Sequence, residues 1–385
     1  MAELQDIVNE FGQEYCDRHQ LPLHQLKALN AIENCRTAEM GGHVDECDAC
    51  GHVNISYNSC RNRHCPKCQK LTSERWIERR KEYLLPVQYF HTVFTLPSIL
   101  NPLTRYNQKE IYNLLFKAAA ETLLELSRDV KYLGAEIGFT TVLHTWGQNL
   151  MDHPHLHCIV PGGGLSPDGK WINAKKDFFI PVKVLSRKFR GKFLAYLRET
   201  YEADELKFGG DVEPLRLLSH FNALLNQLYG LEWVVFCKES FKGPESVIEY
   251  LGRYTHRVAI SNSRIKSIAD GKVTFEWKDR SAGNQTKLMT LDALEFIRRF
   301  LLHILPGRFT KIRHYGLLSN RNRTKVKQCQ VLLKCLRLLT TPTKSTTREL
   351  LLNLFGVDIE KCPCCGKGKM TVRRKFDYNA RHILG

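Results

Sequence analysis

Two histidines in this sequence have the spacing of ligands to a divalent metal ion. They are His155 and His157, in the segment HPHLHCIVPGGGL of residues 153–165. If this segment is a strand, alternate side chains share a face, so both imidazoles point the same way while Leu156 turns into the core. Imidazole is a common ligand for divalent metals, so the pair forms half of a metal site. A metal held there could polarise a phosphate for attack.

The third ligand of that site stays open. We favour Gln148, seven residues before His155, because a neighbouring strand edge could deliver its amide oxygen. His153 and Asp152 are the alternatives. The glycines at 162–164 follow, and such a triplet either forms a turn or lets backbone N–H groups approach a phosphate.

Two tyrosines further along the chain could supply a nucleophile. Tyr250 and Tyr254 stand at i and i+4 in SVIEYLGRYTHRVAI, residues 246–260, so in a helix they share a face about 6 Å apart along the axis. Such pairs usually pack against a core. A tyrosine hydroxyl with a pKa of about 10 attacks phosphate only when a metal and nearby cations assist it. The cations in this segment are Arg253, His256 and Arg257.

Four cysteines predict a structural zinc site in the N-terminal part. Two C-x2-C pairs separated by fourteen residues can fold back and present four thiolates tetrahedrally; they are Cys47 and Cys50, then Cys65 and Cys68. A second zinc site could interleave with the first, formed by Cys35, His43, Cys60 and His64. Otherwise those cysteines are small buried side chains, and the histidines are surface residues or phosphate contacts.

Basic residues surround the two cysteine pairs. We expect DNA contacts from Arg61, Arg63, Lys67, Arg75 and Arg79, although charged runs are usually solvated faces. The whole chain has 57 Lys and Arg against 40 Asp and Glu, a net charge of +17. An excess of that size favours polyanions, with nucleic acid ahead of an anionic membrane surface.

The composition is that of a globular protein. The 385 residues are 43% hydrophobic and 25% charged, which excludes wholesale disorder. Neither a signal peptide nor a run of about 18 apolar residues occurs, so we expect a cytoplasmic, nucleoid-associated protein without a membrane partner. In that compartment clustered cysteines indicate zinc and not disulfides.

Three consecutive zones are expected to position these groups. They are a zinc-binding DNA-recognition domain at 1–88, a catalytic domain at 89–305 and a basic helical region at 306–385. In the middle zone, residues 87–96, 137–146, 155–160, 232–238, 257–262 and 273–278 are predicted strands. Predicted helices lie near 102–128, 184–204, 213–229 and 244–255. This mixture predicts an α+β fold around a mostly antiparallel sheet.

The order of these motifs resembles a known family. The pair His155 and His157 with Tyr250 and Tyr254 downstream resembles the HUH single-strand endonucleases. The full set resembles the two-tyrosine rolling-circle transposases of bacterial insertion sequences, the IS91 type: SCRNRHCPKCQ at 59–69, HTVFTLP at 91–97, HTWGQNLMDHPHLHCIVPGGGLS at 144–166, YLGRYTHRVAISN at 250–262 and IRHYGLLSN at 312–320. The resemblance implies a five-stranded antiparallel HUH sheet with flanking helices and an N-terminal transposase zinc-binding domain. Cys362 and Cys365 resemble half of a terminal zinc knuckle.

The resemblance implies a transposase that binds the ends of an insertion sequence and cleaves and rejoins single-stranded DNA. Mg²⁺ or Mn²⁺ would serve catalysis and Zn²⁺ structure, and a 5′-phosphotyrosine would carry the DNA. Its partners would be hairpin-bearing element ends and target DNA, with the oligomeric state left open. A plasmid replication initiator or a relaxase would use the same chemistry. A zinc-dependent DNA-binding regulator without catalysis is the alternative of another class.

Overall fold

The computed structural model divides the chain into two compact units built from separate segments. The first contains residues 1–78, 256–304 and 342–385, and the second contains residues 79–255 and 305–341. The structure describes residues 2–174, 180–241, 258–279, 282–335 and 345–377, with Val247, Tyr250, Gly252 and Thr255. Within that part, no helix is both long and apolar enough to cross a membrane.

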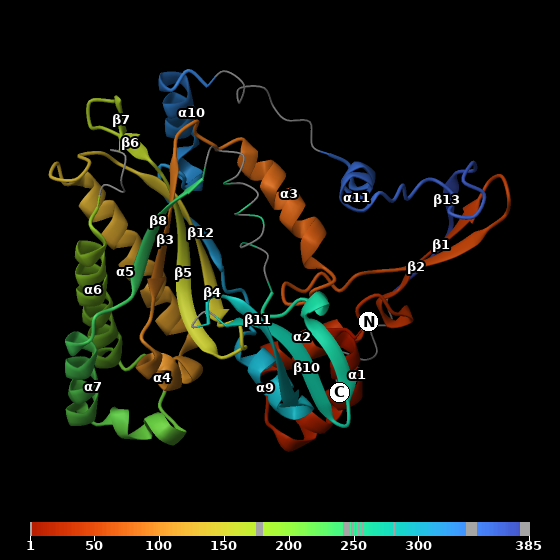
Figure 1. Cartoon of the computed structure of the whole chain (residues 1–385), viewed down its shortest axis with the longest axis horizontal. Helices are drawn as coiled ribbons and strands as arrows, with labels where there is room; N and C mark the ends of the chain where they lie inside the picture. Colours follow the sequence, from red (N-terminus) through yellow and green to blue (C-terminus); the bar gives the residue numbers. More distant parts are fainter. Residues whose placement is uncertain are drawn as a thin grey trace. The chain divides into compact units, whose positions relative to one another are not determined.

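The second unit is built on a five-stranded antiparallel sheet with the order β12-β4-β5-β3-β8 (Figure 1). Its strands are β3 (Tyr89–Thr95), β4 (Gly138–Trp146), β5 (Asp152–Pro161), β8 (Val235–Phe241) and β12 (Ile312–Gly316). The central strand β5 is buried along most of its length, as expected for a strand with neighbours on both sides. The fold class is therefore α+β, as predicted.

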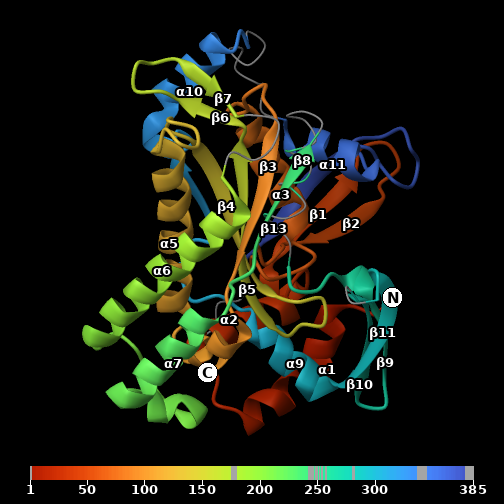
Figure 2. The same cartoon turned by 60° about the vertical axis from the view of Figure 1, so that its left-hand side comes forward.

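Two long helices cover one face of this sheet (Figures 1 and 2). They are α5 (Gln108–Arg128) and α6 (Val182–Glu202), and the shorter α4 (Asn101–Tyr106) and α7 (Leu218–Gly230) pack beside them. Apolar residues recur at three- and four-residue spacing along α5 and α6, which gives each helix one buried stripe. That stripe packs on Leu156, Cys158 and Val160 of β5. Because strand side chains alternate, His155 and His157 lie on the opposite face.

Smaller elements complete the second unit. They are the ribbon of β6 (Gly163–Leu165) and β7 (Trp171–Asn173), the helix α10 (Arg323–Leu332), and the short 3₁₀ helices η2 (Ser98–Leu100), η3 (Gly210–Arg216) and η5 (Asn320–Asn322). In β6, a side chain at Gly164 would meet the carbonyl oxygen of Glu136 at 2.6 Å. Gly162 donates its N–H to the carbonyl of Gln88. These glycines therefore allow close backbone packing.

The first unit contains a three-stranded sheet drawn from both ends of the chain. Its order is β13-β1-β2, with β1 (Gly42–Cys47), β2 (Val53–Tyr57) and β13 (Met370–Phe376). The remaining elements are η1 (Ala38–Met40), α3 (Gln69–Lys81), whose last residues belong to the second unit, and α11 (Thr347–Phe355).

A second part of the first unit combines helices with another sheet. The helices are α1 (Leu4–Arg18), α2 (Leu23–Glu33), α9 (Ala293–Leu302) and the 3₁₀ helix η4 (Asn262–Arg264). The sheet has the order β11-β10-β9, with β9 (Ile265–Ala269), β10 (Lys272–Asp279) and β11 (Gln285–Asp292). Phe275 of β10 packs its ring edge-on against Phe296 of α9 and joins the sheet to the helices.

Several predicted elements differ from the observed ones. Residues 273–278 form a strand but belong to the sheet of the first unit. The strand predicted at 257–262 is wrong for the described residues 258–262, because the Ala259 carbonyl accepts from the Arg264 guanidinium and not from a strand partner. The region after 306 was predicted to be helical, yet it supplies β12 and β13. The helix predicted near 244–255 lies mostly outside the described residues.

Candidate functional site

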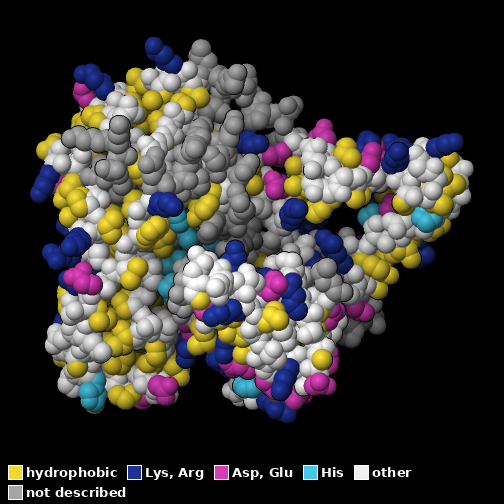
Figure 3. Space-filling model, in the orientation of Figure 1, with side chains coloured by type: hydrophobic (Ala, Val, Ile, Leu, Met, Phe, Trp, Pro, Cys, Tyr) yellow, Lys and Arg dark blue, Asp and Glu magenta, His cyan; other side chains and the backbone are white. Residues whose placement is uncertain are grey.

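Three histidines meet on the face of the large sheet that lies opposite α5 and α6. His155 and His157 come from β5, and His144 comes from β4. The antiparallel register pairs His144 with His155 and Val142 with His157. One nitrogen from each ring lies within 4.8 Å of the others, and all three side chains are buried. Histidine side chains, in cyan, can be seen near the middle of this view of the surface (Figure 3).

Neighbouring groups fix the orientation of two of these rings. Nδ1 of His155 lies 2.5 Å from the carbonyl oxygen of His153, so this nitrogen donates its proton to the backbone. Nδ1 of His157 lies 2.8 Å from Nε2 of His91 in β3. In both rings the second nitrogen, Nε2, is then the one that can bind a cation. Three imidazoles arranged in this way fit a divalent metal ion.

Tyr250 adjoins the histidine cluster through His91. The Tyr250 hydroxyl lies 3.1 Å from Nδ1 and 3.2 Å from Nε2 of His91, and the two rings meet edge to face. The rings of His91 and His157 are nearly parallel, with centroids 5.0 Å apart. Burial lowers the pKa of His91 to about 4, so its ring is neutral near pH 7. A phenol, a neutral imidazole and a candidate metal ligand are thus connected in series.

The residues predicted for this site have different locations in the structure. His155, His157 and Tyr250 lie together, as described above. Gln148 lies in the turn between β4 and β5, and the buried cluster contains His144 as its third member. Of the alternatives, Asp152 pairs with Arg105 at 2.8 Å. The ring of His153 is tilted against that of His155, but it is not a member of the three-histidine cluster. Tyr254, Arg253, His256 and Arg257 lie outside the described residues.

Sequence reasoning did not select His144 or His91. Both lie in quoted motifs, HTWGQNLMDHPHLHCIV and HTVFTLP, but neither is near the histidine pair along the chain. The signal for His144 is its place directly opposite His155 once β4 and β5 are aligned as a hairpin. His91 pairs with Ile159, two residues beyond His157 on the same face of β5.

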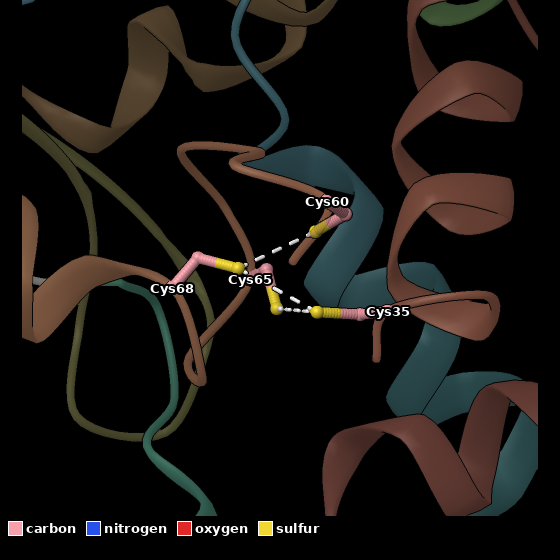
Figure 4. Close-up of side chains that lie close together, drawn as sticks. All are labelled: Cys35, Cys60, Cys65 and Cys68. Atoms are coloured by element: carbon pink, nitrogen blue, oxygen red, sulfur yellow. Dashed lines mark hydrogen bonds between the residues drawn. The ribbon is translucent and has the colours of Figure 1, made fainter. Parts of the chain in front are cut away.

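Four cysteines of the first unit point toward one another (Figure 4). They are Cys35, Cys60, Cys65 and Cys68. The sulfur of Cys68 lies 3.5 Å from that of Cys35 and 3.6 Å from that of Cys60. Thiolates around zinc, with Zn–S bonds of about 2.3 Å, form a tetrahedron with edges of about 3.8 Å. The spacing therefore fits one structural Zn²⁺.

The predicted grouping of the zinc ligands is wrong. Cys65 and Cys68 lie with Cys35 and Cys60, whereas Cys47 and Cys50 lie in a separate cluster with Cys362 and Cys365. Two C-x2-C pairs do not share a metal merely because they are consecutive in the sequence. The fold decides which other two cysteines lie beside each pair. His43 belongs to neither described cluster, and its Nε2 lies 3.2 Å from Asp45. His64 also belongs to neither.

The predicted DNA-contacting residues have different surroundings. Arg61 and Arg79 are exposed, and burial lowers the pKa of the half-buried Arg63. Arg75 donates to the Thr347 hydroxyl at 2.5 Å. Lys67 forms an ion pair with Glu3 and a hydrogen bond with Gln5, so part of its charge is used inside the first unit.

Known families match both parts of this arrangement. Residues 7–96 match a transposase zinc-binding domain named for IS91, and residues 138–325 match the Y2_Tnp family, described as "Putative transposase". A relative from Sinorhizobium fredii, "Putative transposase y4qJ", is 49% identical over 384 residues, covering 97% of this chain and 96% of that protein. This chain belongs to the IS91 family of transposases.

A second relative of this transposase is more distant. The transposase for insertion sequence element IS801 of Pseudomonas savastanoi pv. phaseolicola is 30% identical over 352 residues, covering 89% of this chain and 82% of that protein. Among solved structures, the conjugative relaxase TrwC in complex with mutant oriT DNA aligns at 13% identity over 42% of this chain and 71% of that one. The TM-score of that alignment is 0.25.

Proposed function

We propose that this transposase cleaves and rejoins single-stranded DNA at the ends of its insertion sequence, with Tyr250 as a nucleophile. The observation that carries the proposal is the connected series of Tyr250, His91 and His157, which ends at the three-histidine cluster. A nucleophile and a cation site so close together are what phosphoryl transfer through a covalent intermediate requires. Family membership supplies the substrate class, DNA.

The hydrogen bonds around His91 give it a specific role. If His157 binds a cation through Nε2, its Nδ1 carries the proton and donates to Nε2 of His91. A neutral His91 then carries its proton on Nδ1 and donates to the Tyr250 oxygen. That hydrogen bond orients the oxygen and stabilises the negative charge that it carries during attack.

In the proposed cleavage step, the Tyr250 oxygen forms a bond to the scissile phosphorus while the bond from phosphorus to the 3′-oxygen breaks. The phenol loses one proton and the departing 3′-oxygen gains one, so the step needs no outside reagent. The products are a 5′-phosphotyrosine and a free 3′-hydroxyl. Attack by another DNA 3′-hydroxyl reverses the step and joins the DNA at a new place.

A divalent cation bound by the three imidazoles would polarise the phosphate and lower the barrier to attack. The chemical type of the ligand atoms determines which cation the site prefers. If His144 and not Gln148 is the third ligand, all three protein ligands are nitrogens, whereas Mg²⁺ prefers oxygen ligands. We therefore favour Mn²⁺ over Mg²⁺ as the catalytic ion.

A labelled oligonucleotide tests the proposal. The full-length protein is incubated with single-stranded DNA carrying the subterminal hairpin of its element, and covalent adducts that survive denaturation are counted over Mn²⁺ and Mg²⁺ titrations. We expect adduct with either ion, at lower concentrations of Mn²⁺. His155→Ala and His157→Ala should abolish adduct and retain DNA binding. A wild-type protein that binds this DNA without ever forming adduct would instead be a non-catalytic DNA-binding protein.

A further inference from the structure

Two turns far apart in the sequence bring four thiols together in the first unit. Cys47 and Cys50 lie at the end of β1 and in the turn that follows, and Cys362 and Cys365 lie in the turn before β13. One sulfur from each lies within 4.8 Å of the others. The family match to a zinc-binding domain ends at residue 96, so it contains only two of the four.

The sulfur positions fit a metal and not disulfides. The Cys47 and Cys365 sulfurs are 3.8 Å apart, and the Cys50 and Cys362 sulfurs are 3.7 Å apart. A disulfide needs about 2.05 Å. The edge of a tetrahedron of sulfurs around zinc, with Zn–S bonds of about 2.3 Å, is about 3.8 Å.

The two turns have the same construction. Each reads C-x2-C-G, with Gly51 after the first pair and Gly366 after the second. In each turn the glycine N–H donates to the carbonyl of the first cysteine, at 3.1 Å and 3.0 Å. Both glycines have positive φ, of 70° and 64°, a conformation that glycine adopts without strain. Two matched turns are the usual framework for four-thiolate zinc.

The backbone holds the two turns against each other. Asp48 donates its N–H to the Lys369 carbonyl at 3.1 Å, and the Lys369 N–H donates to the Asp48 carboxylate at 2.8 Å. Strand β13 continues from this contact along β1, pairing Cys47 with Met370. A side chain at Gly368 would overlap the Cys47 sulfur, so this position requires glycine.

Backbone groups also surround the sulfurs. The N–H of Ala49 donates to the Cys47 sulfur at 3.4 Å, and the N–H of Gly368 donates to the Cys365 sulfur at 3.3 Å. Hydrogen bonds of this kind stabilise thiolates, which are the form that binds zinc. We propose that Cys47, Cys50, Cys362 and Cys365 bind a second structural Zn²⁺, which joins the C-terminal turn to the N-terminal zinc-binding region.

Metal analysis of the full-length protein tests this proposal. The wild type should contain two zinc ions per chain, and Cys365→Ser should contain one. Cys364→Ser is the matched control, because Cys364 is exposed and lies outside the described clusters. It should retain both ions. A Cys365→Ser protein with the wild-type zinc content would overturn the proposal.

A second measurement needs no variant and so is independent of folding defects. Cys50 and Cys364 are both exposed, but only Cys50 belongs to the cluster. Brief alkylation of the native protein, mapped by peptide mass, should modify Cys364 and spare Cys50 until a chelator removes zinc, after which both react. Equal modification before chelation would contradict the site. Neither measurement depends on DNA cleavage, so the result stands apart from the proposed catalysis.

Discussion

His91 connects Tyr250, the proposed nucleophile, to His157 of the three-histidine cluster. We expect His91→Gln to slow adduct formation by about 10–100-fold, the usual effect of removing a partner of a metal-ligating histidine. Because His91 acts by orienting Tyr250 and His157, the apparent affinity for the oligonucleotide and the melting temperature should change little. Rates measured at saturating DNA separate the two effects. An unchanged rate would remove His91 from the reaction.

The identity of the third ligand gives a sharp comparison between two neighbouring residues. We expect His144→Ala to reduce adduct formation by more than about 100-fold, since a ligand matters more than its hydrogen-bonding partners. Gln148→Ala, in the adjoining turn, should keep activity within a few-fold of the wild type. Raising Mn²⁺ should partly restore the His144 variant. If Gln148→Ala is the more damaging change, Gln148 is the third ligand, as predicted from the sequence, and the assignment of His144 is wrong.

Tyr250 and Tyr254 are expected to act in turn. In a helix they share one face about 6 Å apart, so a small shift could bring either hydroxyl to one phosphate, but hardly both together. Each single Tyr→Phe change should leave some adduct and cripple complete transposition, and the double change should remove adduct. Peptide mapping decides: phosphotyrosine found at one of the two positions under every condition would contradict alternation and leave Tyr250 or Tyr254 as sole nucleophile.

The sequence identified the residue types that could bind metal better than it identified which of them lie together in the fold. His155 and His157 could be predicted to lie together because residues two positions apart in a strand share a face. His144 could not be singled out, because its partnership depends on the register of a hairpin that shifts between His144 and Trp146. The grouping of the cysteine pairs was predicted wrongly for a similar reason. The C-x2-C spacing identifies a pair of ligands, but it does not say which other cysteines the fold places beside that pair.

At the scale of elements, the edge strand β12 depends on a close backbone approach to β4. Gly316 pairs with Gly138, has a φ of 55°, and a side chain there would overlap the carbonyl oxygen of Ile137. We expect Gly316→Ala to lower the free energy of unfolding by more than about 2 kcal/mol. Gly191→Ala, in α6 with open space around it, should be neutral or raise it by about 0.5–1 kcal/mol. Denaturant titrations measure the free energy of unfolding of both variants. Equal changes would contradict the requirement for glycine at position 316.

Elements with strong periodicity were predictable and those defined by distant partners were not. The strands β3, β4, β5 and β8 lie where alternation and β-branched residues place them, and α5 and α6 follow their apolar stripes. The five residues of β12 lack such a pattern, and only pairing with β4 makes them a strand. Likewise β10 reads as a strand but nothing local says which sheet it joins.

At the scale of the whole molecule, the net charge of +17 governs the encounter with DNA. Binding to single-stranded oligonucleotide should weaken steeply with salt, with log K falling by about 0.7 for each neutralised phosphate per tenfold rise in salt. The slope is measured by fluorescence anisotropy. Arg61→Ala should reduce the magnitude of this slope by at most the contribution of one phosphate contact, about 0.7. A wild-type slope near zero would exclude a binding mode based on phosphate contacts.

The sequence predicts three successive domains, but the observed units are each assembled from separate segments. Residues 256–304 and 342–385 belong with residues 1–78. Patterns along a chain report local structure, whereas this division depends on pairings such as β1 with β13, which join residues more than 300 positions apart. No local signal carries that information.

The pairing of β1 with β13 also constrains the order of events during synthesis. Cys50 and Cys362 are 312 residues apart. At a translation rate of about 5–20 residues per second, the ribosome needs roughly 15–60 seconds to pass from one to the other. For that time the N-terminal cysteine turn has no C-terminal counterpart. The first unit can therefore close only after β13 has been synthesised, whereas the large sheet needs no strand beyond β12 and can form earlier.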